Sequence, residues 1–100
     1  FLGGCYCFTR YKTSDAVKPT RLVLPEGANR DQVLGLAGAV YFGRDLINTP
    51  ASDLGPAEIE NAARKLANTF DGTIKVTEGS SLLSDNFPMI HAVGRASDRL

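Results

Sequence analysis

Few side chains in this sequence could do chemistry, and the first to consider is the single histidine, His91. A Ser–His or Cys–His pair would have to use it as the base. It lies between Ile90 and Ala92 in a short apolar stretch, and a lone histidine cannot build a three-residue zinc site. We therefore interpret His91 as a partly buried or interface residue.

The two cysteines, Cys5 and Cys7, are separated by one residue. Redox pairs and zinc ribbons use Cys-x-x-Cys instead. In a helix, residues two apart point in diverging directions. We interpret both as small apolar side chains in a reducing cytoplasm.

The acidic residues are dispersed along the chain and form no calcium-binding loop pattern. Asp45 and Asp53 are the two acidic residues whose surroundings should be checked first, because they flank the central junction of the sequence. No glycine-rich phosphate loop is present. The sequence thus predicts no catalytic, cofactor-binding or metal-binding residue in this chain.

Composition narrows the class of protein. The 11 basic and 11 acidic residues balance, whereas a general nucleic-acid surface needs an excess of Lys and Arg. A hydrophobic fraction of 43% is typical of a folded chain. No apolar run approaches the roughly 20 residues that span a bilayer. We expect neither a nucleic-acid nor a membrane partner.

The first half of the chain predicts a long helix after less regular segments. Residues 1–11 suggest a helix that Gly3 and Gly4 weaken, residues 13–20 a loop, and residues 21–24 a short strand. Asn29 is a typical N-cap for a helix over about 30–48. That helix is apolar on most sides, and its glycines predict close approach by another element. We expect it to link two bodies.

The second half begins at a junction, Thr49-Pro50, where proline stops the long helix. Gly55 as N-cap and Pro56 at the first position predict a second helix over about 56–70. Its apolar residues follow helical spacing, and Gly72 should end it. Residues 73–77 alternate like a strand, and short helical turns follow near 81–83 and 89–93. The predicted fold class is α/β: a mostly helical chain with two short strands.

The junction also carries a family resemblance. Residues 43–56 read Gly-Arg-Asp-Leu-Ile-Asn-Thr-Pro-Ala-Ser-Asp-Leu-Gly-Pro, which resembles the Arg-x-Leu-x-Asn-Thr-Pro-Ala-Asn junction of the leucyl (cytosol) aminopeptidases. Residues 1–12 are similar to the last helix of that family's amino-terminal domain, residues 22–24 to the strand after it, and residues 87–97 to its Leu-x-Ala-Val-Gly-x-Gly-Ser segment. Ser52 stands where many members carry Asn, and we expect the loop to survive because serine also makes local turn hydrogen bonds.

The resemblance implies a two-domain metallopeptidase that removes amino-terminal residues from peptides. Residues 1–28 would be the tail of a macro-like amino-terminal domain, residues 29–48 a linker helix, and residues 49–100 the start of the catalytic domain. The family holds two divalent ions, manganese or zinc, with residues that would lie downstream of Leu100, so none maps onto this sequence. It also implies a homo-hexamer in the cytoplasm.

Two hypotheses follow, and they differ in whether the apolar side chains of the long helix should be exposed or covered. In the first, the chain is an inactive fragment of such an enzyme, which its start at Phe1 without a methionine favours. In the second, it is a stand-alone, non-catalytic interaction module. A fragment should expose Leu34, Leu36 and Phe42, and a module should cover them.

Overall fold

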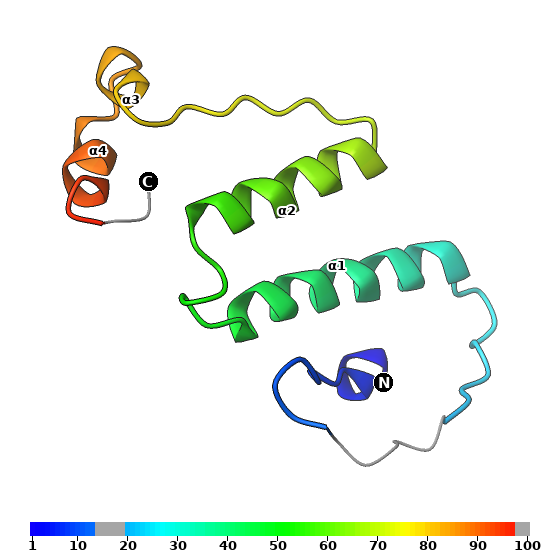
Figure 1. Ribbon diagram of the computed structural model, residues 1–100. Coiled ribbons are helices and arrows are strands. Elements are labelled where there is room, and N and C mark those ends of the chain that lie inside the picture. Colours follow the sequence, from blue (N-terminus) through cyan, green and yellow to red (C-terminus); the bar gives the residue numbers. More distant parts are fainter. Residues whose placement is uncertain (14–19, 98–100) are drawn as a thin grey trace. The chain divides into compact units, whose positions relative to one another are not determined.

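The computed structural model describes residues 1–13 and 20–97 of the chain (Figure 1). In order, the elements are a 3-10 helix η1 (Leu2–Cys5) and four α-helices: α1 (Arg30–Asn48), α2 (Pro56–Thr69), α3 (Ser81–Ser84) and α4 (Pro88–Gly94). They fall into two compact units, Phe1–Thr49 and Pro50–Leu100. Each unit is best understood by itself, from the signals that start and stop its helices.

The first unit is built on α1, whose two ends are set by local side chains. The Asn29 side chain accepts a hydrogen bond from the backbone N–H of Gln32 at 3.0 Å, so it caps the amino end as predicted. At the other end, the Thr49 hydroxyl donates to the Asp45 carbonyl at 2.6 Å. Pro50 follows and prevents another helical turn. The predicted long helix over 30–48 is confirmed.

The second unit opens with α2, which begins where Gly55 and Pro56 predict. The Gly55 N–H donates to the carboxylate of Glu58 at 2.8 Å, which satisfies one donor that the helix start leaves unpaired. Pro56 has no N–H to lose at this position. The amphipathic helix predicted near 56–70 is therefore confirmed at Pro56–Thr69, and the two short helical turns are found as α3 and α4.

Both α2 and α3 end in a left-handed residue that is not glycine. Asp71 has a φ of 50° and Asn86 a φ of 66°. In each case the next residue bonds back to the last turn: Gly72 N–H to the Ala67 carbonyl at 2.8 Å, and Phe87 N–H to the Leu82 carbonyl at 2.7 Å. This is the hydrogen-bond pattern of a Schellman helix end. We predicted that Gly72 would end α2, but the left-handed turn lies one residue earlier.

The predicted α/β fold class is wrong, because the described residues contain no strand. Residues 21–24 and 73–77 have no ladder partner within residues 1–13 and 20–97. Alternating side chains favour an extended backbone, but a strand exists only when a second strand pairs with it. The chain described here is helical.

Two further expectations for the first unit are corrected. The helix expected over 1–11 is reduced to the single turn of η1, after which Tyr6 is extended, as expected for a start weakened by two adjacent glycines. A Cβ placed on Gly35, Gly38 or Gly43 would meet no described atom within 4 Å, so no close neighbour of α1 is seen at these glycines. Of the loop predicted at 13–20, residues 14–19 lie outside the described residues.

The helices keep much apolar surface in contact with solvent. Among residues 1–13 and 20–97, only Gly55 is buried, and no large apolar side chain is. On α1, Leu36 is 64% exposed, while Leu34 and Phe42 are exposed as well. No helix in the described part of the chain has the length and hydrophobicity required to span a membrane.

Candidate functional site

The densest set of polar contacts in the first unit surrounds the Tyr6 side chain. Its hydroxyl donates to the Asp45 carboxylate at 2.7 Å and accepts from the Asn48 side-chain amide at 3.1 Å. The partners lie 39 and 42 positions further along the sequence. A charged acceptor makes the bond to Asp45 the stronger of the two. These bonds fix Tyr6 beside the carboxyl end of α1.

Aromatic and cationic contacts join the same residue to the same face of α1. The ring centroids of Tyr6 and Tyr41 are 5.3 Å apart with planes at 55°, a tilted arrangement that aromatic pairs favour. The Arg44 guanidinium lies 5.4 Å from the centroid of the Tyr6 ring, within the range of a cation–π interaction. We call Tyr6, Tyr41, Arg44, Asp45 and Asn48 the Tyr6 cluster.

Two members of the Tyr6 cluster also hold the backbone of η1. The Tyr41 hydroxyl donates to the Leu2 carbonyl, and Arg44 donates to the Gly3 carbonyl at 2.8 Å. On α1 the four contributing residues are spaced i, i+3, i+4 and i+7, so they lie on one helix face. The cluster thus fastens residues 2–6 to the last two turns of the helix.

The environment of Tyr6 favours its neutral form. Burial against the cluster raises the pKa of the Tyr6 phenol above its usual value of 10.0, and the hydrogen bond to Asp45 raises it further. The negative charge of Asp45 acts in the same direction, whereas Asn48 and the positive charge of Arg44 act against it. Tyr6 is therefore a hydrogen-bond donor at neutral pH, and it is poorly suited to act as a base.

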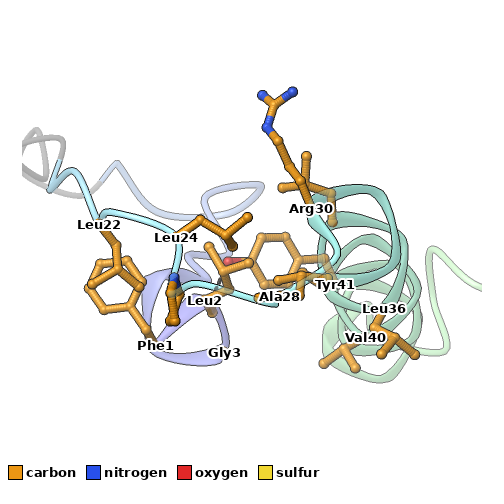
Figure 2. Close-up of a pocket in the computed structure, with 14 residues that line it drawn as sticks. Phe1, Leu2, Gly3, Leu22, Leu24, Ala28, Arg30, Leu36, Val40 and Tyr41 are labelled. Atoms are coloured by element: carbon orange, nitrogen blue, oxygen red, sulfur yellow. Dashed lines mark hydrogen bonds between the residues drawn. The ribbon is translucent and has the colours of Figure 1, made fainter.

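An apolar cavity of about 600 Å³ lies beside the Tyr6 cluster. Figure 2 shows Phe1, Leu2 and Gly3 of the amino-terminal segment on one side, and Leu36, Val40 and Tyr41 of α1 on another. Residues 22–28 supply the third wall through Leu22, Leu24, Pro25 and Ala28. Arg30 is the charged residue among the fourteen that line it. The lining can accept apolar groups but holds no set of side chains for chemistry.

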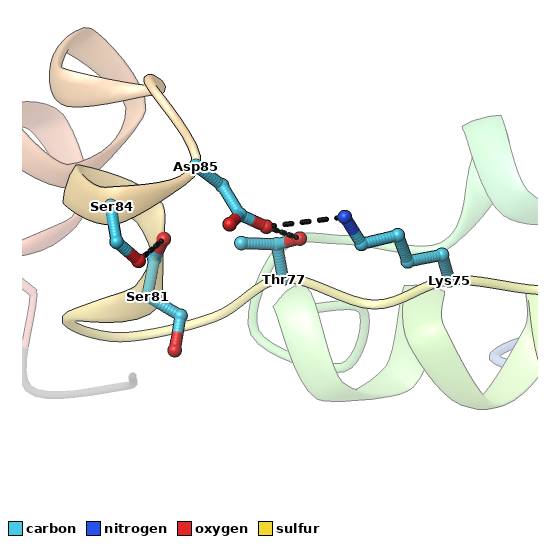
Figure 3. A network of polar contacts seen from close by, with 5 residues as sticks. All are labelled: Lys75, Thr77, Ser81, Ser84 and Asp85. Atoms are coloured by element: carbon cyan, nitrogen blue, oxygen red, sulfur yellow. Dashed lines mark hydrogen bonds and ion pairs between the residues drawn. The ribbon is translucent and has the colours of Figure 1, made fainter.

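The second unit has a smaller polar network, shown in Figure 3, between residues 75 and 85. The Asp85 carboxylate accepts from the Thr77 hydroxyl at 3.0 Å and pairs with Lys75 at 3.3 Å. The Lys75 side chain is 84% exposed, so water weakens this ion pair. The network ties the extended segment at 73–77 to the end of α3, which is a structural role.

The structure places the residues singled out from the sequence at separate points. His91 is half-buried in α4, where its backbone bonds to Phe87 and Arg95. Cys5 and Cys7 are exposed on either side of Tyr6. Asp45 belongs to the Tyr6 cluster, whereas Asp53 is half-buried in the turn after Pro50, where its N–H donates to the Pro50 carbonyl at 2.9 Å.

Sequence reasoning missed the Tyr6 cluster, although it drew attention to Asp45. A signal was present: after the apolar residues 33–40 of the helix, its last two turns carry a polar and aromatic stripe of Tyr41, Arg44, Asp45 and Asn48. Such a stripe indicates a polar partner. The sequence did not show that the partner is Tyr6, since 39 residues separate Tyr6 from Asp45.

The described residues do not fit a metal ion. Within residues 1–13 and 20–97, no three His, Cys, Asp or Glu side chains gather into a group that could hold one. Divalent ions in enzymes need several such ligands around one point. We therefore derive no metal-dependent step from these residues, and the expectation that the chain contains no metal ligand stays a prediction.

Comparison with known proteins identifies the second unit and the end of α1. The family model for the cytosol aminopeptidase family, catalytic domain, matches residues 41–100, more than half of the chain. This chain belongs to the cytosol aminopeptidase family. No solved structure matches it. The cytosol aminopeptidase match begins at Tyr41, so all four α1 residues of the Tyr6 cluster lie inside the matched region, and Tyr6 lies outside it.

Proposed function

We propose that this chain is a non-catalytic part of a leucyl-aminopeptidase-like metallopeptidase: a linker helix followed by the opening of the catalytic domain. The intact enzyme would hydrolyse amino-terminal residues from peptides in the cytoplasm, as a homo-hexamer with two divalent ions, manganese or zinc. The observation that carries the proposal is the match of the cytosol aminopeptidase catalytic domain to residues 41–100. The metal ligands and the reacting groups would come from other residues of the protein.

The exposed surface of the helices supports this role. Leu34, Leu36 and Phe42 on α1 are all exposed, as the fragment reading predicted and as the reading of a self-contained interaction module did not. The last helix repeats the pattern, with Met89 at 76% and Val93 at 77% exposure. Apolar surface of this extent is stabilised when further protein covers it. We propose that the rest of the same protein provides the cover.

Hydrolysis of a leucine anilide tests the proposal. The protein that carries this chain should release leucine in the presence of manganese or zinc and lose that activity when the ion is chelated. The 100-residue chain by itself should release none under the same conditions. Turnover by the isolated chain would overturn the assignment of the chemistry to other residues. An intact protein without metal-dependent turnover would overturn the peptidase proposal.

A further inference from the structure

The two cysteines of the chain lie on either side of Tyr6, where the backbone is not helical. Cys5 ends η1, and Tyr6 follows it in an extended conformation, with a φ of -64° and a ψ of 130°. The sequence argument against a cysteine pair assumed a helix, in which side chains two residues apart diverge. Because Tyr6 is extended, that argument does not apply to Cys5 and Cys7.

An extended Tyr6 keeps the two cysteines at a distance that a disulfide bridge can span. Successive Cα atoms are about 3.8 Å apart, so the residues on either side of an extended one have Cα atoms roughly 6–7 Å apart. Disulfide bridges join residues whose Cα atoms are about 4.4–6.8 Å apart. The backbone at Tyr6 therefore permits a bridge between Cys5 and Cys7.

The contacts of Tyr6 with α1 leave its two neighbours on the solvent side. The Tyr6 hydroxyl bonds to Asp45 at 2.7 Å and to Asn48 at 3.1 Å, so the side chain of Tyr6 points at the helix. Side chains along an extended backbone alternate between two faces, which places Cys5 and Cys7 on the opposite face from Tyr6. Both are exposed, so a small oxidant can reach them.

Two accessible thiols at this spacing can undergo thiol–disulfide exchange with a small disulfide such as oxidised glutathione. The thiolate of one cysteine attacks a sulfur of the small disulfide, whose S–S bond breaks and releases one glutathione thiolate. The thiolate of the other cysteine then attacks the cysteine sulfur of the mixed disulfide and releases the second glutathione thiolate. The pair loses two electrons and two protons, and two molecules of reduced glutathione form.

We propose that Cys5 and Cys7 are a reversible redox pair, which a small disulfide such as oxidised glutathione converts into an intramolecular bridge around Tyr6. Exposed thiols beside a second, resolving thiol are typical of redox sensors. A bridge across one residue closes a small, strained ring, and strained, exposed bridges are the ones that cellular thiols reduce again. The ring contains the backbone of Tyr6, so oxidation restricts the residue at the centre of the Tyr6 cluster.

Mass spectrometry of the full chain after treatment with oxidised glutathione tests the pair. Trypsin cuts after Arg10, so one peptide contains both cysteines, and a bridge lowers its mass by two hydrogen atoms. With about 0.1 mM oxidised glutathione, the bridged peptide should exceed the doubly glutathionylated one by about tenfold or more, because a neighbouring thiol has an effective concentration of at least about millimolar. Dithiothreitol should restore the reduced peptide.

The variants Cys5→Ser and Cys7→Ser identify the two steps. Each keeps one thiol and should stop at the mixed disulfide, with one glutathione bound. Two separate glutathione adducts in the unchanged chain, bridges between chains, or no reaction would each overturn the proposal. A bridge that forms in guanidinium but not in the folded chain would overturn it as well, since the fold would then hold the thiols apart.

The effect on Tyr6 has its own measurement. The NMR ring resonances of Tyr6 should shift when the bridge forms and return when dithiothreitol reduces it. The double variant Cys5→Ser/Cys7→Ser should show no shift under the same treatment. Unchanged Tyr6 resonances in a bridged chain would contradict a restriction of Tyr6. None of these measurements uses peptidase activity, so their outcome is independent of the function proposed above.

Discussion

The two units of this chain are stabilised over very different distances in sequence. In the first, Tyr6 bonds to Asp45, 39 positions away, and the contacts of the Tyr6 cluster join two separate segments. In the second, Asp85 bonds to Lys75 and Thr77, which lie within ten positions of it in the sequence. Glu58 bonds to the backbone at the start of α2, and Arg64 pairs with Glu60 one turn away on the same helix.

This difference has a thermodynamic consequence. Closing the long loop between Tyr6 and Asp45 costs more conformational entropy than closing a helix end, so the first unit needs several cooperating contacts. The contacts named for the second unit join residues that are near in sequence, so each of them closes a shorter loop. Local perturbations should therefore stay local in the second unit, while a change at one residue of the Tyr6 cluster should reach a distant segment.

The largest expected effect comes from breaking α1 itself with Ala39→Pro. Proline in the middle of an exposed helix removes a hydrogen bond and clashes with the preceding turn, a cost of about 3 kcal/mol. The matched change Ala39→Gly should cost about 1 kcal/mol. Circular dichroism should show loss of helix, and amide exchange should show loss of protection across α1. Equal effects of Ala39→Pro and Ala39→Gly would contradict a regular α-helix at this position.

A smaller effect, and one that stabilises, is expected for Asp71→Gly. Asp71 has a φ of 50°, a conformation that costs a residue with a side chain about 1 kcal/mol and costs glycine little. The substitution should raise the free energy of unfolding of α2 by about 0.5–1 kcal/mol. The matched change Asn86→Gly should gain less, because asparagine tolerates this region better. A loss of stability in Asp71→Gly would show that its side chain has a further role.

Alkaline titration tests the contact between Tyr6 and Asp45 in the first unit. Because burial and Asp45 raise the folded-state pKa of Tyr6 above 10.0, the stability it contributes is fully present below about pH 10 and is lost as the pH rises through the raised value. In an NMR titration, the ring resonances of Tyr6 should therefore shift at a higher pH than those of an unfolded tyrosine. In Asp45→Ala the titration should move to lower pH, and an unmoved titration would contradict the cluster.

The smallest effect is expected for Lys75→Ala. The Lys75 side chain is 84% exposed, and exposed ion pairs contribute about 0.2–1 kcal/mol. The midpoint of thermal unfolding should fall by about 1–8 °C, and by less in high salt. Thr77→Val, which removes the second contact to Asp85, should cost a similar amount. A large loss from Lys75→Ala would mean that this network stabilises more than its own segment.

Local signals in the sequence were enough to predict α1 and α2. Asn29 and Pro50 bound α1, and Gly55 with Pro56 starts α2, because a cap or a proline acts on its immediate neighbours. The strands at 21–24 and 73–77 were predicted wrongly because pairing depends on a partner that alternation does not reveal. Asp45 was recognised as unusual, but its bond to Tyr6 depends on how the intervening residues fold.

The end of α2 also bears on the chemical lifetime of the chain. Asp71-Gly72 is the type of dipeptide in which the glycine nitrogen readily attacks the preceding carboxyl, forming a succinimide that reopens to isoaspartate. Here that nitrogen already donates to the Ala67 carbonyl at 2.8 Å, and the backbone of Asp71 is held at a φ of 50°. The bond that closes the helix thus restrains the attacking atom, and the folded chain should age more slowly at this position than the unfolded one.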